Sequence, residues 1–93
     1  MSYELRFKEE ALNEWRRLDA VIREQFKRKL AERLELPQVP SARLLGHPHR
    51  YKIKLRASGF RLVYEVREQE IVVVVIAVGK RERNAVYKAA AGR

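Results

Sequence analysis

The chain has 93 residues, the length of one small domain, so we expect a single domain over residues 1–93. It contains no cysteine, which excludes disulfide bonds and thiolate metal sites and makes a reducing compartment, the cytoplasm, the expected location. Lysine and arginine total 21 and aspartate and glutamate total 12, and the resulting net charge of +9 attracts polyanions such as RNA, DNA and acidic proteins.

The N-terminal residues predict a strand followed by a helix. Tyr3, Leu5 and Phe7 alternate with polar residues, which is typical of a short edge strand. Apolar residues at helical spacing then predict a helix from about Lys8 to Leu18. The first seven residues contain no long apolar stretch, so a signal peptide is not expected.

A second helix follows almost at once, with apolar residues at steps of four. Asp19 is its expected N-cap, and Pro37 ends it, because the residue before a proline avoids the α region. We therefore expect a helical hairpin. The basic residues expected on its outer face are Arg16, Arg17, Arg23, Lys27 and Arg28.

The second half of the chain predicts a sheet and a final helix. The segment from Gln38 to Arg50 contains two prolines and a glycine and is expected to be a loop. Alternating residues over 51–56 and 60–67, and a β-branched run from Ile71 to Val78, predict three strands joined by short turns. Gly79 is expected to end the last strand, and Lys80 to Ala91 to form a short basic helix.

These elements follow the order βααβββα, which predicts an α+β fold. Three consecutive strands with short turns form an antiparallel meander, and the helical hairpin is expected to cover one face and leave the other partly open. The apolar run from Ile71 to Val78 is too short to span a bilayer as a helix, so no membrane partner is expected.

Basic side chains and one tyrosine are expected to meet on the open face of the sheet. If the odd-numbered residues of the segment 51–56 face the core, the even-numbered ones face solvent. The side chains expected to form this basic groove are Lys52, Lys54, Arg56, Arg61, Arg81 and Tyr87. Fixed cations bind phosphate and an aromatic ring stacks on an unpaired base, although a plain solvated strand face has the same pattern.

The two histidines give a weaker indication of chemistry. His47 and His49 lie two residues apart in the proline-containing loop, and a histidine pair can act as base and acid near neutral pH. No carboxylate is placed by the sequence to orient either ring. No cluster of acidic residues has metal-ligand spacing, so no metal or other cofactor is expected.

Six stretches spread over nearly the whole chain form a recognisable pattern: Glu14 to Leu18, Arg23 to Gln25, Leu44 with Gly46, Tyr51 to Arg56, Gly59 to Tyr64, and Val78 to Arg83 with Tyr87. In these stretches and their spacing the chain resembles RelE toxins. The resemblance implies the RelE fold and cleavage of messenger RNA in the decoding site of the ribosome. It also implies a RelB-like antitoxin encoded beside the toxin, with operator DNA bound only through the antitoxin complex.

The resemblance also implies which residues act. The active residues carried over by position are Lys52, Lys54, Arg61, Arg81 and Tyr87. The basic residues expected to contact RNA or the small-subunit ribosomal RNA are Arg43, Arg50, Arg56, Lys80, Arg83, Arg23, Lys27 and Arg28. One departure concerns Leu45, because family members can carry a basic residue directly before the glycine of the Leu-x-Gly motif.

The division of labour within this set stays open. Crowded cations lower the pKa of a lysine and favour the phenolate of a tyrosine, so Lys52 and Tyr87 are both candidates for the base. Lys54 and Arg61 fit charge stabilisation in the transition state, and Arg81 the leaving side. Two alternatives use the same scaffold without chemistry: a ParE-like gyrase inhibitor and a plain RNA-binding or ribosome-binding module.

Overall fold

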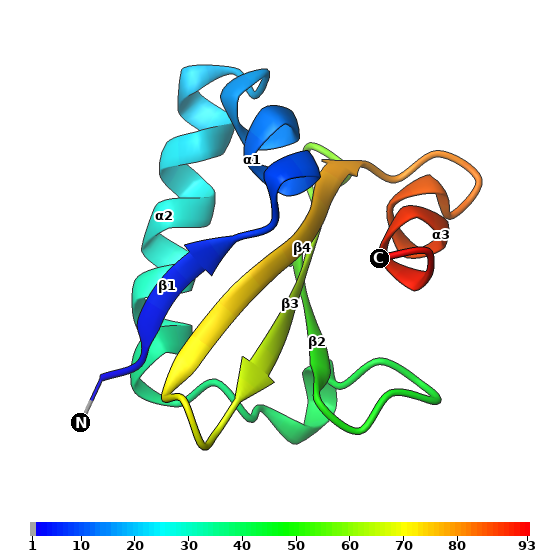
Figure 1. The fold of residues 1–93 in the computed structure, drawn as a ribbon. Helices are drawn as coiled ribbons and strands as arrows, with labels where there is room; N and C mark the ends of the chain where they lie inside the picture. The colour runs from blue at the N-terminus through cyan, green and yellow to red at the C-terminus, as the bar shows by residue number, and fades with distance from the viewer. Residues whose placement is uncertain (1) are drawn as a thin grey trace.

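A computed structural model describes residues 2–93 and confirms the predicted element order. The elements are β1 (Glu4–Phe7), α1 (Glu9–Arg16), α2 (Ala20–Glu35), the 3-10 helix η1 (Pro40–Ala42), β2 (Arg50–Leu55), β3 (Phe60–Arg67), β4 (Val72–Lys80) and α3 (Ala85–Ala91). Figure 1 shows the sheet with α1 and α2 on one side and α3 on the other.

The sheet has the strand order β1-β4-β3-β2. β2, β3 and β4 form the predicted antiparallel meander, and β1 joins it at the edge in a parallel pair with β4. The sheet is therefore mixed, a feature that the short-turn argument did not include. β1 can pair in this direction because α1 and α2 form the long crossover that a parallel pair needs.

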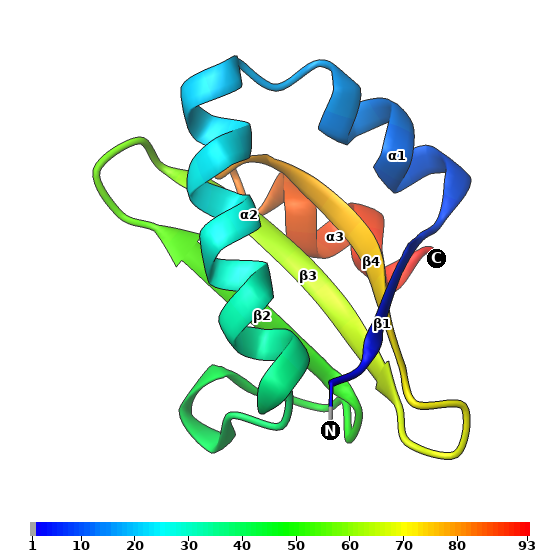
Figure 2. The same cartoon turned by 90° about the vertical axis from the view of Figure 1, so that its left-hand side faces the viewer.

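The two faces of the sheet bury two separate clusters. In Figure 2, α2 crosses in front of the strands and α3 lies behind them. The cluster under α1 and α2 contains Trp15, Phe26 and Tyr64, and the cluster under α3 contains Val63 and Val86. β4 contributes to both clusters, and Val72 to Val78 are all buried. Its unbroken apolar sequence reflects burial on both faces.

Several boundaries differ from the sequence prediction, and the predicted loop from Gln38 to Arg50 contains η1 and the first residue of β2. β4 does not end at Gly79 but continues through Lys80, paired with Phe60, and α3 begins only at Ala85. The turn between them contains Arg83 and Asn84, both in the left-handed region with φ of 51° and 60°. α1 ends at Arg16, two residues before the predicted Leu18.

A β-bulge interrupts the pairing of β3 and β4. Val63 is opposite Ala77 and Tyr64 is opposite Val75, so Ile76 has no partner residue on β3. A bulge leaves backbone groups outside the ladder and bends the strand locally. Ile76 is the middle residue of β4. Among residues 2–93, no helix is long and apolar enough to cross a membrane.

Candidate active site

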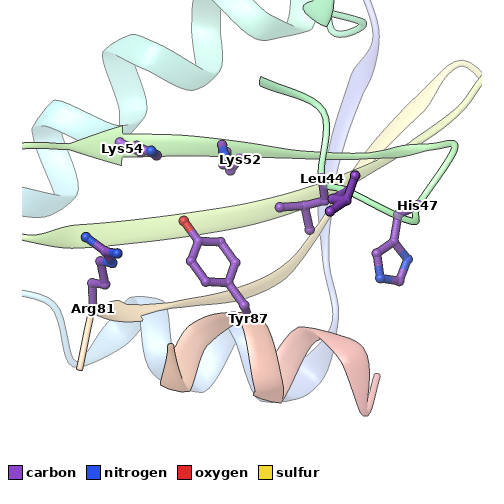
Figure 3. Close-up of a pocket in the computed structure, with 7 residues that line it drawn as sticks. Leu44, His47, Lys52, Lys54, Arg81 and Tyr87 are labelled. Atoms are coloured by element: carbon purple, nitrogen blue, oxygen red, sulfur yellow. The ribbon is translucent and has the colours of Figure 1, made fainter. Parts of the chain in front are cut away.

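One open pocket gathers four of the five predicted active residues. It has a volume of about 340 Å³ and lies between β2, the end of β4 and α3. The residues lining it are Leu44, Leu45, His47, Lys52, Lys54, Arg81 and Tyr87. Figure 3 shows the Tyr87 hydroxyl pointing away from α3 toward the strands, with Arg81 on one side of the ring and His47 on the other.

The alternation of β2 places two lysines beside this pocket. Tyr51 and Ile53 are buried on the side of the helical hairpin, whereas Lys54 is exposed and Lys52 partly exposed. The Tyr51 ring stacks on that of Tyr64 on β3, with centroids 5.6 Å apart and an interplanar angle of 18°. Burial of one side of the strand thus fixes the direction of the lysines on the other.

Arg61, the fifth predicted active residue, adds a mostly buried charge beside the two lysines. It lies opposite Lys54 in the register of β2 and β3, and only 7% of it is exposed. Its Nη1 donates to the Phe60 carbonyl oxygen at 3.0 Å, whereas its buried Nε has no hydrogen-bond partner within residues 2–93. The sequence predicted an accessible groove residue, and the structure instead buries most of it. A buried guanidinium with a free donor is stabilised when an anion binds nearby.

The end of β4 is tied to the turn before β3. The backbone N–H of Arg81 donates to the Gly59 carbonyl oxygen at 2.7 Å. Gly59 has φ of +78°, which favours glycine in this turn. This hydrogen bond holds the backbone of Arg81 against the turn between β2 and β3, the strands that contain Lys54 and Arg61. Arg81 itself is exposed and reaches the pocket.

The cations act on one another electrostatically. Repulsion from Lys52 lowers the pKa of Lys54 below its ordinary value, and burial and the charges of Arg56, Arg61 and Arg81 lower it further. The two lysines and two arginines of the site are therefore close enough to form one positive field. Such a field suits the binding of a phosphate and of the extra charge that develops on it in a transition state.

Tyr87 comes from the opposite side of the pocket, on α3. Its ring is partly buried and packs against the cluster that contains Val86 and Ala90. α3 has only seven residues. A helix of this length is not stable alone, so the position of Tyr87 depends on contacts of α3 with the rest of the domain.

Three residues that were given no active role from the sequence also line the pocket, in the loop before β2. Leu44 and His47 lie at the end of the pocket away from Arg81 (Figure 3), and Leu45, which also lines the pocket, is fully exposed. His47 had been weighed as a catalytic residue and set aside for lack of an orienting carboxylate, and none lines the pocket. An apolar end beside a cationic end is suited to a base and a phosphate of one nucleotide.

The predicted RNA or ribosome contacts fall into two groups. Arg43, Arg56, Lys80, Arg83, Lys27 and Arg28 are exposed. The other two make internal bonds: Arg23 donates to the Leu18 carbonyl oxygen at 3.1 Å, and Arg50 donates to Glu65 at 3.1 Å and to the Ala90 carbonyl oxygen at 2.6 Å. Within residues 2–93, no group of three or more His, Cys, Asp or Glu side chains could hold a metal ion.

Comparison with known proteins gives the class of this fold and site. Residues 5–85 match the family described as ParE toxin of type II toxin-antitoxin system, parDE. The match covers most of the chain, from β1 to the start of α3. The chain belongs to this class of toxins.

Within the class, its similarity is to RelE. The chain is 55% identical over 93 residues to the Escherichia coli K12 protein named mRNA interferase toxin RelE, covering 100% of this chain and 98% of that protein. The free E. coli RelE (R81A/R83A) mutant has a TM-score of 0.92 at 53% identity, covering 100% of this chain and 98% of that one. The toxin in the intact E. coli RelBE complex has a TM-score of 0.85 at 55% identity, covering 88% of this chain and 100% of that one. The chain is a member of the RelE toxin family.

Proposed function

We propose that this protein is the toxin of a type II toxin–antitoxin system, a metal-independent endoribonuclease that cuts messenger RNA in the ribosomal A site and so inhibits translation. One observation carries the proposal. Lys52 and Lys54 on β2, Arg81 after β4 and Tyr87 on α3 line a single pocket, in a chain 55% identical to an mRNA interferase. Three separate elements thus bring cations and an aromatic hydroxyl to one place.

The chemistry would use the nucleophile that RNA itself carries, the 2′-hydroxyl. The enzyme then needs a base for that proton, a proton for the 5′ leaving oxygen, and positive charge beside the phosphate. We assign Lys54 and Arg61 to the developing charge and Arg81 to the leaving side. Lys52 and Tyr87 remain the two candidates for the base, and the position of the Tyr87 hydroxyl inside the pocket favours Tyr87.

The ribosome would supply what this site lacks. No residue in the pocket except His47 ordinarily titrates near neutral pH, so proton transfer alone gives limited acceleration. Holding the message in an in-line geometry can contribute roughly 7–11 kcal/mol. Contacts of the exposed basic residues on α2 and beside the pocket with ribosomal RNA would bring the site to the message.

A RelB-like antitoxin is the expected partner protein. A solved structure of a relative is that of the intact E. coli RelBE toxin–antitoxin complex. The +9 charge of this chain favours an acidic or amphipathic segment that folds on binding and covers the basic face or displaces α3. Operator DNA would be bound only through that complex. If cells expressing the active toxin without any antitoxin gene grow normally, this part of the proposal is wrong.

The test is cleavage on programmed ribosomes with an end-labelled message. The expected products carry a 2′,3′-cyclic or 3′-phosphate and a 5′-hydroxyl, because attack by the 2′-hydroxyl needs no metal-bound water. A 5′-phosphate on the downstream fragment would rule out this mechanism. Arg6→Gln, an exposed cation on the edge strand β1 and away from the pocket, is the matched control and should cleave normally.

The same assay separates the two rivals. A plain RNA-binding or ribosome-binding module would bind programmed ribosomes and leave the message intact. A ParE-like toxin, the class whose family model matches residues 5–85, would also leave it intact and would inhibit DNA gyrase in a supercoiling assay. Cleavage with the expected ends excludes both.

A further inference from the structure

A network of partly buried polar contacts lies at the C-terminal end of α3. The Arg93 guanidinium donates to both carboxylate oxygens of Glu14 on α1, at 2.8 Å and 3.0 Å. The pair is partly buried, with 16% of the Arg93 side chain and 27% of the Glu14 side chain exposed. Its two residues are 79 positions apart in the chain, so it joins the first helix to the residues after the last.

Each partner of the pair also holds a backbone group of β4. Arg93 Nη1 donates to the carbonyl oxygen of Ile76 at 2.9 Å, and Glu14 Oε1 accepts the backbone N–H of Val78 at 3.2 Å. Ile76 is the bulge residue without a partner on β3. Buried backbone groups outside a ladder need side-chain partners. The ion pair is thus held at a fixed point of β4, at the bulge residue and just beyond Val75, where the pairing with β1 ends.

Two further cations hold the last carbonyl groups of the α3 segment. Arg50 donates to the Ala90 carbonyl oxygen at 2.6 Å while paired with Glu65, and Lys8 Nζ donates to the Arg93 carbonyl oxygen at 3.1 Å. The last carbonyls of a helix have no partner within it and carry partial negative charge. We call Glu14, Arg93, Arg50 and Lys8 together the α3 clamp.

The clamp matters because of what α3 carries. α3 is seven residues long, and the residues that anchor it in the apolar core are Val86 and Ala90. Tyr87 lies between those anchors in the sequence and projects from α3 into the pocket. A rotation or shift of so short a helix moves the Tyr87 hydroxyl relative to Arg81 and Lys52. A misplacement of about 1 Å can lower a rate ~100-fold.

We infer that Glu14 and Arg93 are positioning residues of the RNA-cleaving site: their ion pair, seated on the bulge of β4, fixes α3 so that Tyr87 stands in the pocket. The inference rests on the proposed function for its effect on cleavage, but not for its effect on α3. Neither residue lines the pocket, so neither is expected to touch RNA. Hydrogen bonding to Glu14 raises the pKa of Arg93, so its guanidinium stays charged at neutral pH.

The first test measures α3 without any cleavage. In Arg93→Ala and Glu14→Gln, hydrogen exchange of the α3 backbone amides that bond within the helix, such as those of Lys88 and Gly92, should rise about tenfold or more. Amides of the β2–β3 ladder should exchange as in the parent protein. Glu9→Gln, an exposed acidic residue on the same helix as Glu14, is the control and should change neither. Unchanged α3 exchange in both clamp variants would overturn the inference.

The second test asks whether the clamp acts through Tyr87. On programmed ribosomes, Arg93→Ala and Glu14→Gln should lower single-turnover cleavage about 10–100-fold and leave ribosome affinity unchanged, with Arg93→Lys in between. In a Tyr87→Ala background the same changes should have no further effect on the rate. Full additivity of the two losses would show a general structural role instead and would overturn the inference.

Failure of the proposed function has a different signature. If the parent protein itself cuts no message on programmed ribosomes, the ribonuclease proposal is wrong. The positioning of Tyr87 by the clamp is then still tested by hydrogen exchange and by the NMR shift of the Tyr87 ring. If the parent cuts and the clamp variants cut equally well, the ribonuclease proposal stands and the positioning role is wrong.

Discussion

Lys54 and Arg61 lie directly opposite each other on β2 and β3, so that two cations occupy neighbouring positions on one face of the sheet. Like charges in this arrangement destabilise a sheet. Here the repulsion is compounded, because Arg61 is 7% exposed and its Nε has no partner within the described chain. Such a pair of cations suits the binding of an anion. Removing one of the two charges should therefore raise the stability of the fold and lower the activity of the site.

Arg61→Met tests this opposition. Replacing a buried, incompletely paired charge with an apolar side chain of similar length should raise the free energy of unfolding, by about 1 kcal/mol or more. Cleavage should fall ~100–1000-fold, because one preorganised donor to the transition state is lost. Urea unfolding and single-turnover cleavage measure the two effects. A variant that is both less stable and fully active would show that Arg61 serves the fold alone.

Tyr87 separates a base from a stacking platform. If the hydroxyl acts as base or orients the 2′-hydroxyl, Tyr87→Phe should lose about as much cleavage as Tyr87→Ala. If only the ring matters, Tyr87→Phe should keep most activity. We expect the first outcome, with ribosome binding preserved in both variants. Lys88→Ala, the exposed neighbour on α3, serves as control and should behave as the parent.

Lys54 should make the rate sensitive to alkaline pH. Because its pKa is lowered, Lys54 loses its proton at a pH below that of an ordinary lysine, and a rate that needs its charge should fall there as pH rises. Added salt should move this fall to higher pH, since screening weakens the repulsion from Lys52. Lys54→Arg stays charged and should lack the fall. NMR titration of the lysine ε-carbon checks the assignment, and a Lys54 titration at the ordinary lysine value would contradict it.

Tyr64 makes a separate prediction about the fold. Its hydroxyl donates to the Pro37 carbonyl oxygen at 2.7 Å and accepts from Arg33 Nη1 at 2.9 Å, joining the end of α2 to β3. Tyr64→Phe leaves both partners short of a bond and should lower the free energy of unfolding by about 1–3 kcal/mol. The control is Tyr51→Phe, which keeps the ring that stacks on Tyr64. It should change the free energy of unfolding by less than about 0.5 kcal/mol. Equal losses in the two variants would contradict this account.

Local patterns in the sequence were sufficient to predict most of the fold. Alternation along 51–56 separates Ile53 from Lys52 and Lys54, and the adjacency of β2, β3 and β4 follows from their short connections. The burial of Arg61 could not be read in the same way, because alternation gives the face of a side chain and not what covers it.

Long-range pairings were beyond local reasoning for the same cause. The parallel pairing of β1 with β4, the bulge at Ile76 and the Glu14–Arg93 pair each join residues far apart in the chain. Nothing in the spacing of charges distinguishes Glu14 from the exposed Glu9, or Arg50 from the exposed Arg56. Which charge becomes internal depends on which backbone groups and counter-charges the fold brings beside it: β4 for Glu14, and Glu65 with the end of α3 for Arg50.

The late position of β4 and α3 in the chain has a consequence during synthesis. β1 cannot pair with β4 until residues 72–75 have been synthesised, and the pocket is incomplete until Tyr87 has also been synthesised. Contacts of such sequence separation form late in folding. A ribosome translating this protein is therefore not exposed to a finished nuclease on its own growing chain. If translation stalls before α3 has left the ribosome, the nascent chain should not cut the message that encodes it. Chains released after complete synthesis should cut messages on other ribosomes.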